Sequence, residues 1–311
     1  MMPASVHQTG GATAVIIAAV LWGTTGTAAT FAPALSPLAV GSVAMGIGGL
    51  FQGLIAATPL IRQRRLIFRH WPFLLTGTLA VAVYPLAFYA SMRYAGVTVG
   101  TVISIGSAPL LSALIEYRLE GVRLTKQWAG GAATGLAGMI LLCLAESGGH
   151  STGQGSAMTG ITLGLLAGFT YALYSWSARR LMQGGIAPRA AMGATFGAGG
   201  ILLVPVLLMT GAPLLETWNN AAVGIYMALV PMFLGYLCYG YGLARIPASM
   251  ATTITLLEPV VAALLAVLLV GERLPLSGWA GVGLIIACLG VITFPADKRS
   301  SPSTQRRADN L

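Results

Sequence analysis

Long runs of apolar residues, separated by short polar segments, fill almost the whole chain. Because a helix needs about 20 apolar residues to cross the hydrocarbon of a bilayer, each run is long enough to span a membrane. The first run is too long for a signal-peptide core and no Lys or Arg precedes it, so we expect it to be retained. We therefore predict an all-α polytopic membrane protein with ten transmembrane helices, at 12–31, 37–61, 71–92, 96–116, 127–145, 158–178, 188–210, 218–243, 248–270 and 276–295.

The basic residues lie mainly in alternate polar segments, which predicts how the chain is oriented. If the N-terminal tail (1–11) is cytoplasmic, all of the 17 Lys and Arg residues except Arg93 and Arg273 fall on the cytoplasmic side. Such a bias is the positive-inside pattern of membrane proteins. We expect a multi-pass protein of a bacterial inner (plasma) membrane with both termini, including the 296–311 tail, in the cytoplasm.

Composition supports the membrane assignment and excludes other classes. Hydrophobic residues form 56% of the chain, charged residues 8%, and the mean hydropathy is +0.81. A soluble domain carries roughly 25% charged residues, so most of this surface must face lipid. The net charge of +9 does not indicate a nucleic-acid partner, because the basic residues lie in short clusters between apolar runs.

The chain also repeats itself at an offset of about 150 residues. The rarer residue types that match include Tyr89/Tyr239, Pro109/Pro259, Arg123/Arg273 and, one residue further, Trp128/Trp279. Each half contains five predicted helices, an odd number, so the halves must enter the membrane in opposite orientations. Inverted repeats of this kind are typical of secondary transporters, whose site lies near the midplane between the halves. We predict five-helix repeats at 12–146 and 158–295, joined by an extracytoplasmic connector at 147–157.

Three segments carry a resemblance to a known family. They are AAVLWGTTG (18–26), ALYSWSARRL (172–181) and TLLEPVVAALLAVLLVGERLPLSGWAGVGLI (255–285). With these, the chain resembles the drug/metabolite transporter superfamily, in particular its ten-helix exporters with paired EamA-type domains, and most of all the amino acid exporters, including those for aromatic amino acids. The resemblance covers roughly 12–295. It implies alternating access to a central cavity lined by helices 1, 3, 4, 6, 8 and 9. The direction of transport, export instead of uptake, is implied by this resemblance and by no other feature of the sequence.

Glu258 is the ionisable residue that we place deepest in a span. An acid at the centre of a membrane helix costs about 2.5–3.5 kcal/mol, so it should face a cavity. It could bind a substrate ammonium, carry a proton, or form a neutral hydrogen bond between helices; the sequence leaves all three open. The first half has Ile105–Pro109 at the corresponding place, without an acid. Arg93 and Glu116, near span ends, should extend toward the interface and orient their helices.

Two mid-span prolines, Pro109 and Pro259, each remove a backbone donor and disturb the local helix. The freed carbonyls need internal partners, so such positions tend to face a cavity or another helix. The prolines are candidate hinges, with a static kink as the alternative.

Aromatic and hydroxyl side chains inside the spans are the other candidates. A buried phenol needs a hydrogen-bond partner, which a wet cavity or a substrate supplies, but both phenols and hydroxyls also join helices. Together with Glu258, we expect the following to line the substrate cavity: Trp22, Tyr84, Tyr89, Ser104, Ser107, Tyr171, Tyr174, Tyr239 and Thr255.

The residues argue against an enzyme. His7, His70 and His150 are scattered over loops and Asp297 is the first Asp, so no catalytic or metal cluster is expected, and no cofactor. Small zwitterionic or neutral solutes fit best, and we favour amino acids with aromatic or apolar side chains. Proton-coupled efflux of lipophilic cations is the alternative, although it usually requires a carboxylate in the first helix, where none is found. Proton exchange and facilitated diffusion both remain open.

Overall fold

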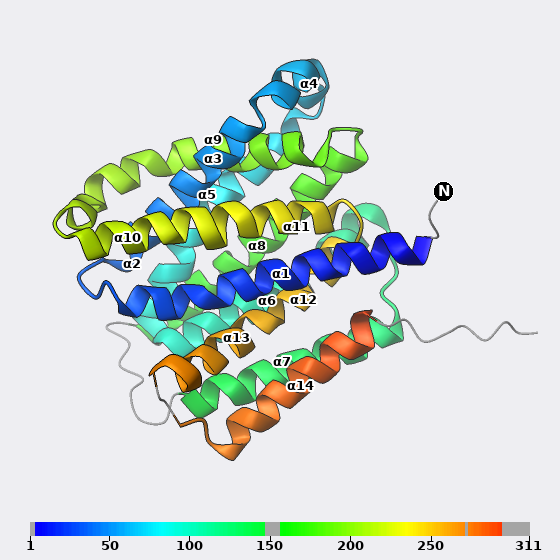
Figure 1. Ribbon diagram of the computed structural model, residues 1–311. Coiled ribbons are helices and arrows are strands. Elements are labelled where there is room, and N and C mark those ends of the chain that lie inside the picture. The colour runs from blue at the N-terminus through cyan, green and yellow to red at the C-terminus, as the bar shows by residue number, and fades with distance from the viewer. Residues whose placement is uncertain (1–3, 147–155, 271–272, 294–311) are drawn as a thin grey trace, which may run out of the picture.

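The computed structural model describes residues 4–146, 156–270 and 273–293, and every regular element in these ranges is a helix (Figure 1). The first half contains α1 (Ala4–Thr30), α2 (Pro37–Ser42), η1 (Val43–Ile47), α3 (Gly48–Ile55), α4 (Ala57–Arg69), α5 (Trp71–Ala95), α6 (Val97–Glu120) and α7 (Lys126–Glu146). The second half contains α8 (Ala157–Gln183), α9 (Pro188–Thr210), η2 (Ala212–Leu215), α10 (Trp218–Met227), η3 (Ala228–Leu234), α11 (Gly235–Leu243), α12 (Ala248–Ile254), η4 (Thr255–Leu257), α13 (Glu258–Leu265), η5 (Ala266–Val270) and α14 (Leu276–Thr293).

The packing of the helices relates the two halves by an approximate two-fold axis. The third and sixth helices pack together (α5 and α8), and so do their counterparts, the eighth and first (α11 and α1). The fourth packs on the sixth (α6 and α8) as the ninth packs on the first (α13 and α1). The second and seventh helices (α3 and α9) pair across the axis, as do the fifth and tenth (α7 and α14) at one edge of the bundle (Figure 1). The fold is therefore two inverted five-helix repeats, as predicted.

Three of the spans are not uniform α-helices. The second and eighth each contain a π-helical stretch, η1 and η3, and the ninth changes from α-helix to a 3₁₀ turn, η4, and ends in π-helix η5. In the eighth helix the stretch contains Pro231, which lacks the N–H that an α-helix needs. Short π segments are frequent at functional sites because they change the direction in which nearby side chains point.

Nine stretches of the described residues are long and apolar enough to cross a membrane, and α8 is not among them. This helix is long enough to span a bilayer, but it carries several hydroxyl side chains and ends in Arg179 and Arg180. It packs between α5 and α6, with Tyr171, Tyr174 and Ser175 almost fully buried. It can therefore be less apolar than its neighbours, because much of its surface faces protein instead of lipid.

The second helix is shorter than the predicted 37–61. The chain breaks at Ala56, and the separate helix α4 follows with Arg62, Arg64, Arg65 and Arg69. α4 projects from the bundle in Figure 1. α4 extends from the same end of the bundle as the C-termini of α6 and α8, and we call this the arginine-rich end.

Candidate functional site

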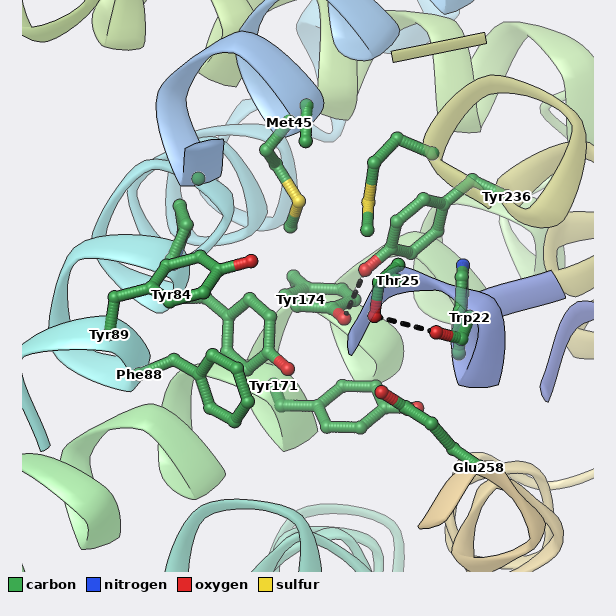
Figure 2. A pocket seen from close by; sticks show the side chains of 14 residues that line it. Trp22, Thr25, Met45, Tyr84, Phe88, Tyr89, Tyr171, Tyr174, Tyr236 and Glu258 are labelled. Atoms are coloured by element: carbon green, nitrogen blue, oxygen red, sulfur yellow. Dashed lines mark hydrogen bonds between the residues drawn. The ribbon is translucent and has the colours of Figure 1, made fainter. Parts of the chain in front are cut away.

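A narrow cavity lies in the bundle between its middle and the end opposite the arginine-rich end. Figure 2 shows the side chains that line it. It leaves about 40 Å³ open to a water-sized sphere. One water needs roughly 10–15 Å³ of such space, so the cavity admits a few waters, and its walls must separate before a larger solute enters. The lining residues are Trp22, Thr25, Gly41, Ala44, Met45, Tyr84, Pro85, Phe88, Tyr89, Tyr171, Tyr174, Met232, Tyr236 and Glu258.

Most of the residues that the sequence nominated meet in this cavity. They come from the first, third, sixth and ninth helices and are Trp22, Tyr84, Tyr89, Tyr171, Tyr174 and Glu258. The rings pack closely: the centroids of Tyr84 and Tyr171 are 5.5 Å apart, and those of Tyr171 and Tyr174 are 5.2 Å apart. The walls are thus mainly aromatic, with polar groups at a few points.

Trp22 is held in place by the eighth helix. Its indole Nε1 donates a 2.9 Å hydrogen bond to the carbonyl oxygen of Pro231, in the π-helical stretch η3. The ring lies against Gly235, where an added Cβ would come 2.7 Å from Nε1. The irregular backbone of η3 therefore supplies the acceptor that a buried indole needs, and Gly235 makes room for the ring.

Tyrosine hydroxyls are paired at the floor of the cavity. Tyr174 and Tyr236 share a 2.8 Å hydrogen bond, shown dashed in Figure 2. Tyr171 donates to Thr255 at 2.9 Å, which joins α8 to the 3₁₀ turn just before Glu258. These bonds connect α8 to the eighth and ninth helices at mid-span, so the floor of the cavity is a polar contact between helices of the second half.

Tyr239 and Thr255 do not line the cavity. Both side chains are fully buried. Tyr239 packs on Trp22, with centroids 5.2 Å apart, and its hydroxyl is 2.8 Å from Ser175 Oγ. Thr255 is covered by Tyr171. They lie directly behind the lining residues and position them.

Ser104 and Ser107 also lie outside the cavity lining. Both belong to α6, where the chain packs on Gly168 of α8: a Cβ added at Gly168 would come 2.0 Å from Ser107 Oγ and 2.7 Å from the carbonyl oxygen of Ser104. The two helices touch at this point, so no open space is left for a solute. The fourth helix contributes no residue to the described lining, in contrast to the expectation from the resemblance.

The second helix takes the place expected for the fourth. Gly41 lies in α2, and Ala44 and Met45 lie in the π-helical stretch η1. Sequence reasoning missed these residues because small and apolar side chains in a span look the same whether they face lipid or a cavity. Tyr236 and Thr25 had the chemistry to be nominated, whereas Pro85, Phe88 and Met232 gave no separate signal.

Glu258 is the charged residue of the described lining. It is the first residue of α13, directly after the 3₁₀ turn, and its side chain enters the cavity beside Tyr171 (Figure 2). Its backbone carbonyl lies against Gly23 of α1, so Glu258 sits next to Trp22. A carboxyl group at this depth that faces a cavity can contact a solute.

The two prolines differ in their effect. α6 continues through Pro109 as one α-helix, whereas the ninth helix changes to a 3₁₀ turn immediately before Glu258 and Pro259. Pro259 removes the donor that the carbonyl of Thr255 would otherwise accept from, which explains the tighter turn. Hinge roles for both prolines remain predictions.

The arginine-rich end of the bundle is closed by polar contacts between helices. Glu116, at the end of α6, accepts from the backbone N–H of Ala248 at 2.7 Å and from Ser249 Oγ at 2.5 Å. Arg179, near the end of α8, donates to the carbonyls of Leu243, the last residue of α11, and of Ile246, which follows it. Glu116 is only 1% exposed, so the expectation that it reaches the membrane interface is wrong. It caps the N-terminus of α12, where a negative charge is favourable.

Within the described residues, no group of three His, Cys, Asp or Glu side chains could hold a metal ion. Once its walls separate, the cavity can offer a small solute its aromatic rings, one carboxyl group and a few phenols.

Residues 9–144 and 158–294 each match the EamA-like transporter family. The chain belongs to this family. It is a multi-pass membrane transporter, and the family is one of carriers, not enzymes. The two matches correspond to the two halves of the bundle.

Relatives of the family match over nearly the full length. The chain is 31% identical over 292 residues to the uncharacterized transporter YwfM of Bacillus subtilis (strain 168), covering 94% of this chain and 95% of that protein. It is 25% identical to the uncharacterized inner membrane transporter YicL of Salmonella typhimurium, covering 92% and 96%. It is 27% identical to a probable terminal-alkyne amino-acid exporter of Streptantibioticus cattleyicolor, covering 86% and 91%.

A solved crystal structure supports the fold. It superimposes with a TM-score of 0.74, at 20% sequence identity, and covers 90% of this chain and 95% of the other. At this identity, the likeness concerns the arrangement of helices.

Proposed function

We propose that this EamA-like transporter exports small metabolites, above all amino acids with aromatic or apolar side chains, by alternating access through the cavity between its two repeats. The observation that carries the proposal is the cavity itself, which lies inside the bundle and is lined by seven aromatic rings and Glu258. Aromatic walls favour apolar and aromatic solutes, and a few polar groups fix their orientation. The amino-acid exporter among the relatives agrees with this substrate class.

The proposal includes the place and direction of transport. With the arginine-rich end in the cytoplasm of a bacterial cell, both termini are cytoplasmic and the end of the bundle nearer to the cavity faces outside. The repeats then extend over 12–146 and 158–295, with the connector 147–157 outside. Alternating access requires the contacts at the arginine-rich end to open while the opposite end closes.

Flux through purified full-length protein in liposomes tests the proposal. We expect efflux of preloaded phenylalanine, tyrosine, tryptophan or leucine to exceed that of aspartate or lysine by tenfold or more. Empty liposomes and protein with Trp22→Ala serve as controls. Absence of flux for every amino acid, with lipophilic cations moving instead, would contradict the proposal.

Proton-coupled efflux of lipophilic cations is the second candidate, because a carboxyl group faces the cavity. A pH gradient across the liposome membrane distinguishes proton exchange from facilitated diffusion. Exchange against protons predicts that the gradient drives accumulation of the substrate, and facilitated diffusion predicts that substrate only equilibrates. Glu258→Gln should abolish the effect of the gradient if this residue carries the proton.

A further inference from the structure

The described lining of the cavity contains an acidic side chain and no basic one. Glu258 is negatively charged when ionised, and no Lys, Arg or His belongs to the lining of the described residues. An amino acid carries an ammonium and a carboxylate group, so only the ammonium has a partner of opposite charge here. A substrate carboxylate held in the same narrow space would be repelled by Glu258.

The rings next to Glu258 suit a positive charge. Tyr171 donates its hydroxyl to Thr255, and Tyr174 and Tyr236 share one hydrogen bond, so these side chains contribute mainly their rings to the cavity wall. Trp22 packs 4.8 Å from Tyr236 and 6.5 Å from Tyr171, centroid to centroid. Aromatic rings gathered around a carboxyl group attract ammonium groups through the negative charge on the ring faces.

The position of Glu258 brings a carboxyl group next to α1, although α1 itself contains no acidic residue. A carrier of cations was expected to need a carboxylate in its first helix, and α1 has none. The ninth helix, however, lies directly on α1: a Cβ added at Gly23 would come 2.5 Å from Cβ of Val261 and 2.8 Å from the carbonyl oxygen of Glu258. This contact brings the carboxyl group of α13 to the side of the cavity that Trp22 lines.

We propose that the cavity recognises the ammonium group of its substrate through Glu258 and the surrounding rings, and that it offers the carboxylate no group of opposite charge. The substrate class is therefore organic ammonium compounds with an apolar or aromatic body, which includes amino acids, their amides and the corresponding amines. This inference rests on the proposed function, since it assigns the substrate group that the same cavity binds.

A series of related ligands tests the inference by calorimetric binding to the purified full-length protein. The probes are L-phenylalanine, L-phenylalanine amide, trimethyl(2-phenylethyl)ammonium and 3-phenylpropionate, which keep the ring and vary the two charged groups. The two cationic probes should bind at least as tightly as phenylalanine, and 3-phenylpropionate at least tenfold more weakly. Equal binding of 3-phenylpropionate and the amide would overturn the inference.

Variants of Glu258 give the second readout. Glu258→Gln should weaken binding of both cationic probes tenfold or more, while Glu258→Asp, which keeps the charge, should retain most of it. Glu216→Gln is the matched control, because Glu216 is exposed and remote from the cavity lining. Unchanged binding of the cationic probes to a folded Glu258→Gln would refute the role of Glu258. If that variant does not fold, the ligand series and Glu258→Asp still decide.

The inference and the proposed function fail in different ways. Phenylalanine flux without binding of either cationic probe would leave the transporter proposal standing and reject ammonium recognition. Tight binding of the cationic probes without flux of any amino acid would support ammonium recognition and reject amino-acid export. Neither binding nor flux would reject both.

Discussion

The fourth and ninth helices occupy equivalent places in the two repeats, but only the ninth forms part of the cavity. α6 carries Ala108 before Pro109, is continuous, and faces α8. The ninth helix carries Glu258 before Pro259, tightens into a 3₁₀ turn, and sends its acid into the cavity. The two repeats therefore place equivalent helices in similar surroundings, but residues 105–108 and 255–258 differ in sequence and in helix type, and only the ninth helix brings an acid to the described lining.

An acid placed at Ala108, the position in the first half that corresponds to Glu258, should have the largest effect on the folded protein. Ala108 is fully buried, so Ala108→Glu would place a carboxyl group without a cavity or partner among packed helices, at a cost of several kcal/mol. We expect loss of folded protein in size-exclusion chromatography and a Tm reduced by ten degrees or more. Ala108→Ser, of similar size, should remain folded. A stable and active Ala108→Glu would show that the fourth helix also faces open space.

Replacing each proline in turn compares the fourth and ninth helices directly. Pro259→Ala restores an N–H donor to the carbonyl of Thr255, so the 3₁₀ turn can relax to α-helix and rotate Glu258 away from its present position. We expect substrate flux in liposomes to fall about tenfold. Pro109→Ala should change flux less than twofold, because α6 is already continuous at that point. Equal losses would mean that both prolines act in the same way.

Glu116 links the two compared helices, because it extends from α6 to the start of α12. Glu116→Gln removes the carboxylate that accepts from the backbone N–H groups of Ala248 and Ser249, which weakens hydrogen bonds worth about 1.5–3 kcal/mol. Hydrogen exchange in a peptide covering 248–254 should become at least fivefold faster. Glu120→Gln is the control, since Glu120 contacts Trp176 and Arg180 instead of α12. Unaltered exchange in 248–254 would contradict a capping role.

The smallest effect concerns the bond that braces the 3₁₀ turn. Tyr171→Phe keeps the ring in the cavity wall and removes only the hydroxyl that binds Thr255. A bond of this kind contributes about 1 kcal/mol, so KM for flux should rise a few-fold with the fold intact. Tyr241→Phe, at an exposed ring outside the lining, should leave KM unchanged. A larger effect, with loss of transport, would assign the hydroxyl a direct role in substrate contact.

Chemistry and periodicity made much of this molecule predictable. Glu258 stood out because an acid deep in an apolar span is costly unless a cavity accepts it, and the aromatic residues stood out because a buried indole or phenol needs a partner. The ten spans followed from the length of apolar runs, and the two repeats from matches such as Pro109 and Pro259. These features depend on the chemistry of single residues or on their order along the chain, and both can be read from the sequence without knowledge of contacts between helices.

The remaining features depend on contacts between helices that are distant in sequence. Ser104 and Ser107 have the same chemistry as a ligand-binding hydroxyl, and only the approach of Gly168 shows that they face a helix. Met45 lies in the cavity because of the π-helical stretch η1, which no residue type in the sequence predicts. Glu116 lies near a span end, as an orientation residue would, but the start of α12 covers it.

The closed arginine-rich end also has a kinetic consequence. In the alternating access proposed above, the bonds of Glu116 and Arg179 to the segment 243–249 must break before the arginine-rich end opens, so they favour the conformation described here over the open one. Under that proposal, ligand that arrives at the arginine-rich end binds only to the less populated open conformation, which lowers its apparent affinity from that side. The transporter should therefore show a strong difference between the concentrations that half-saturate it from its two sides, although both sides lead to one cavity.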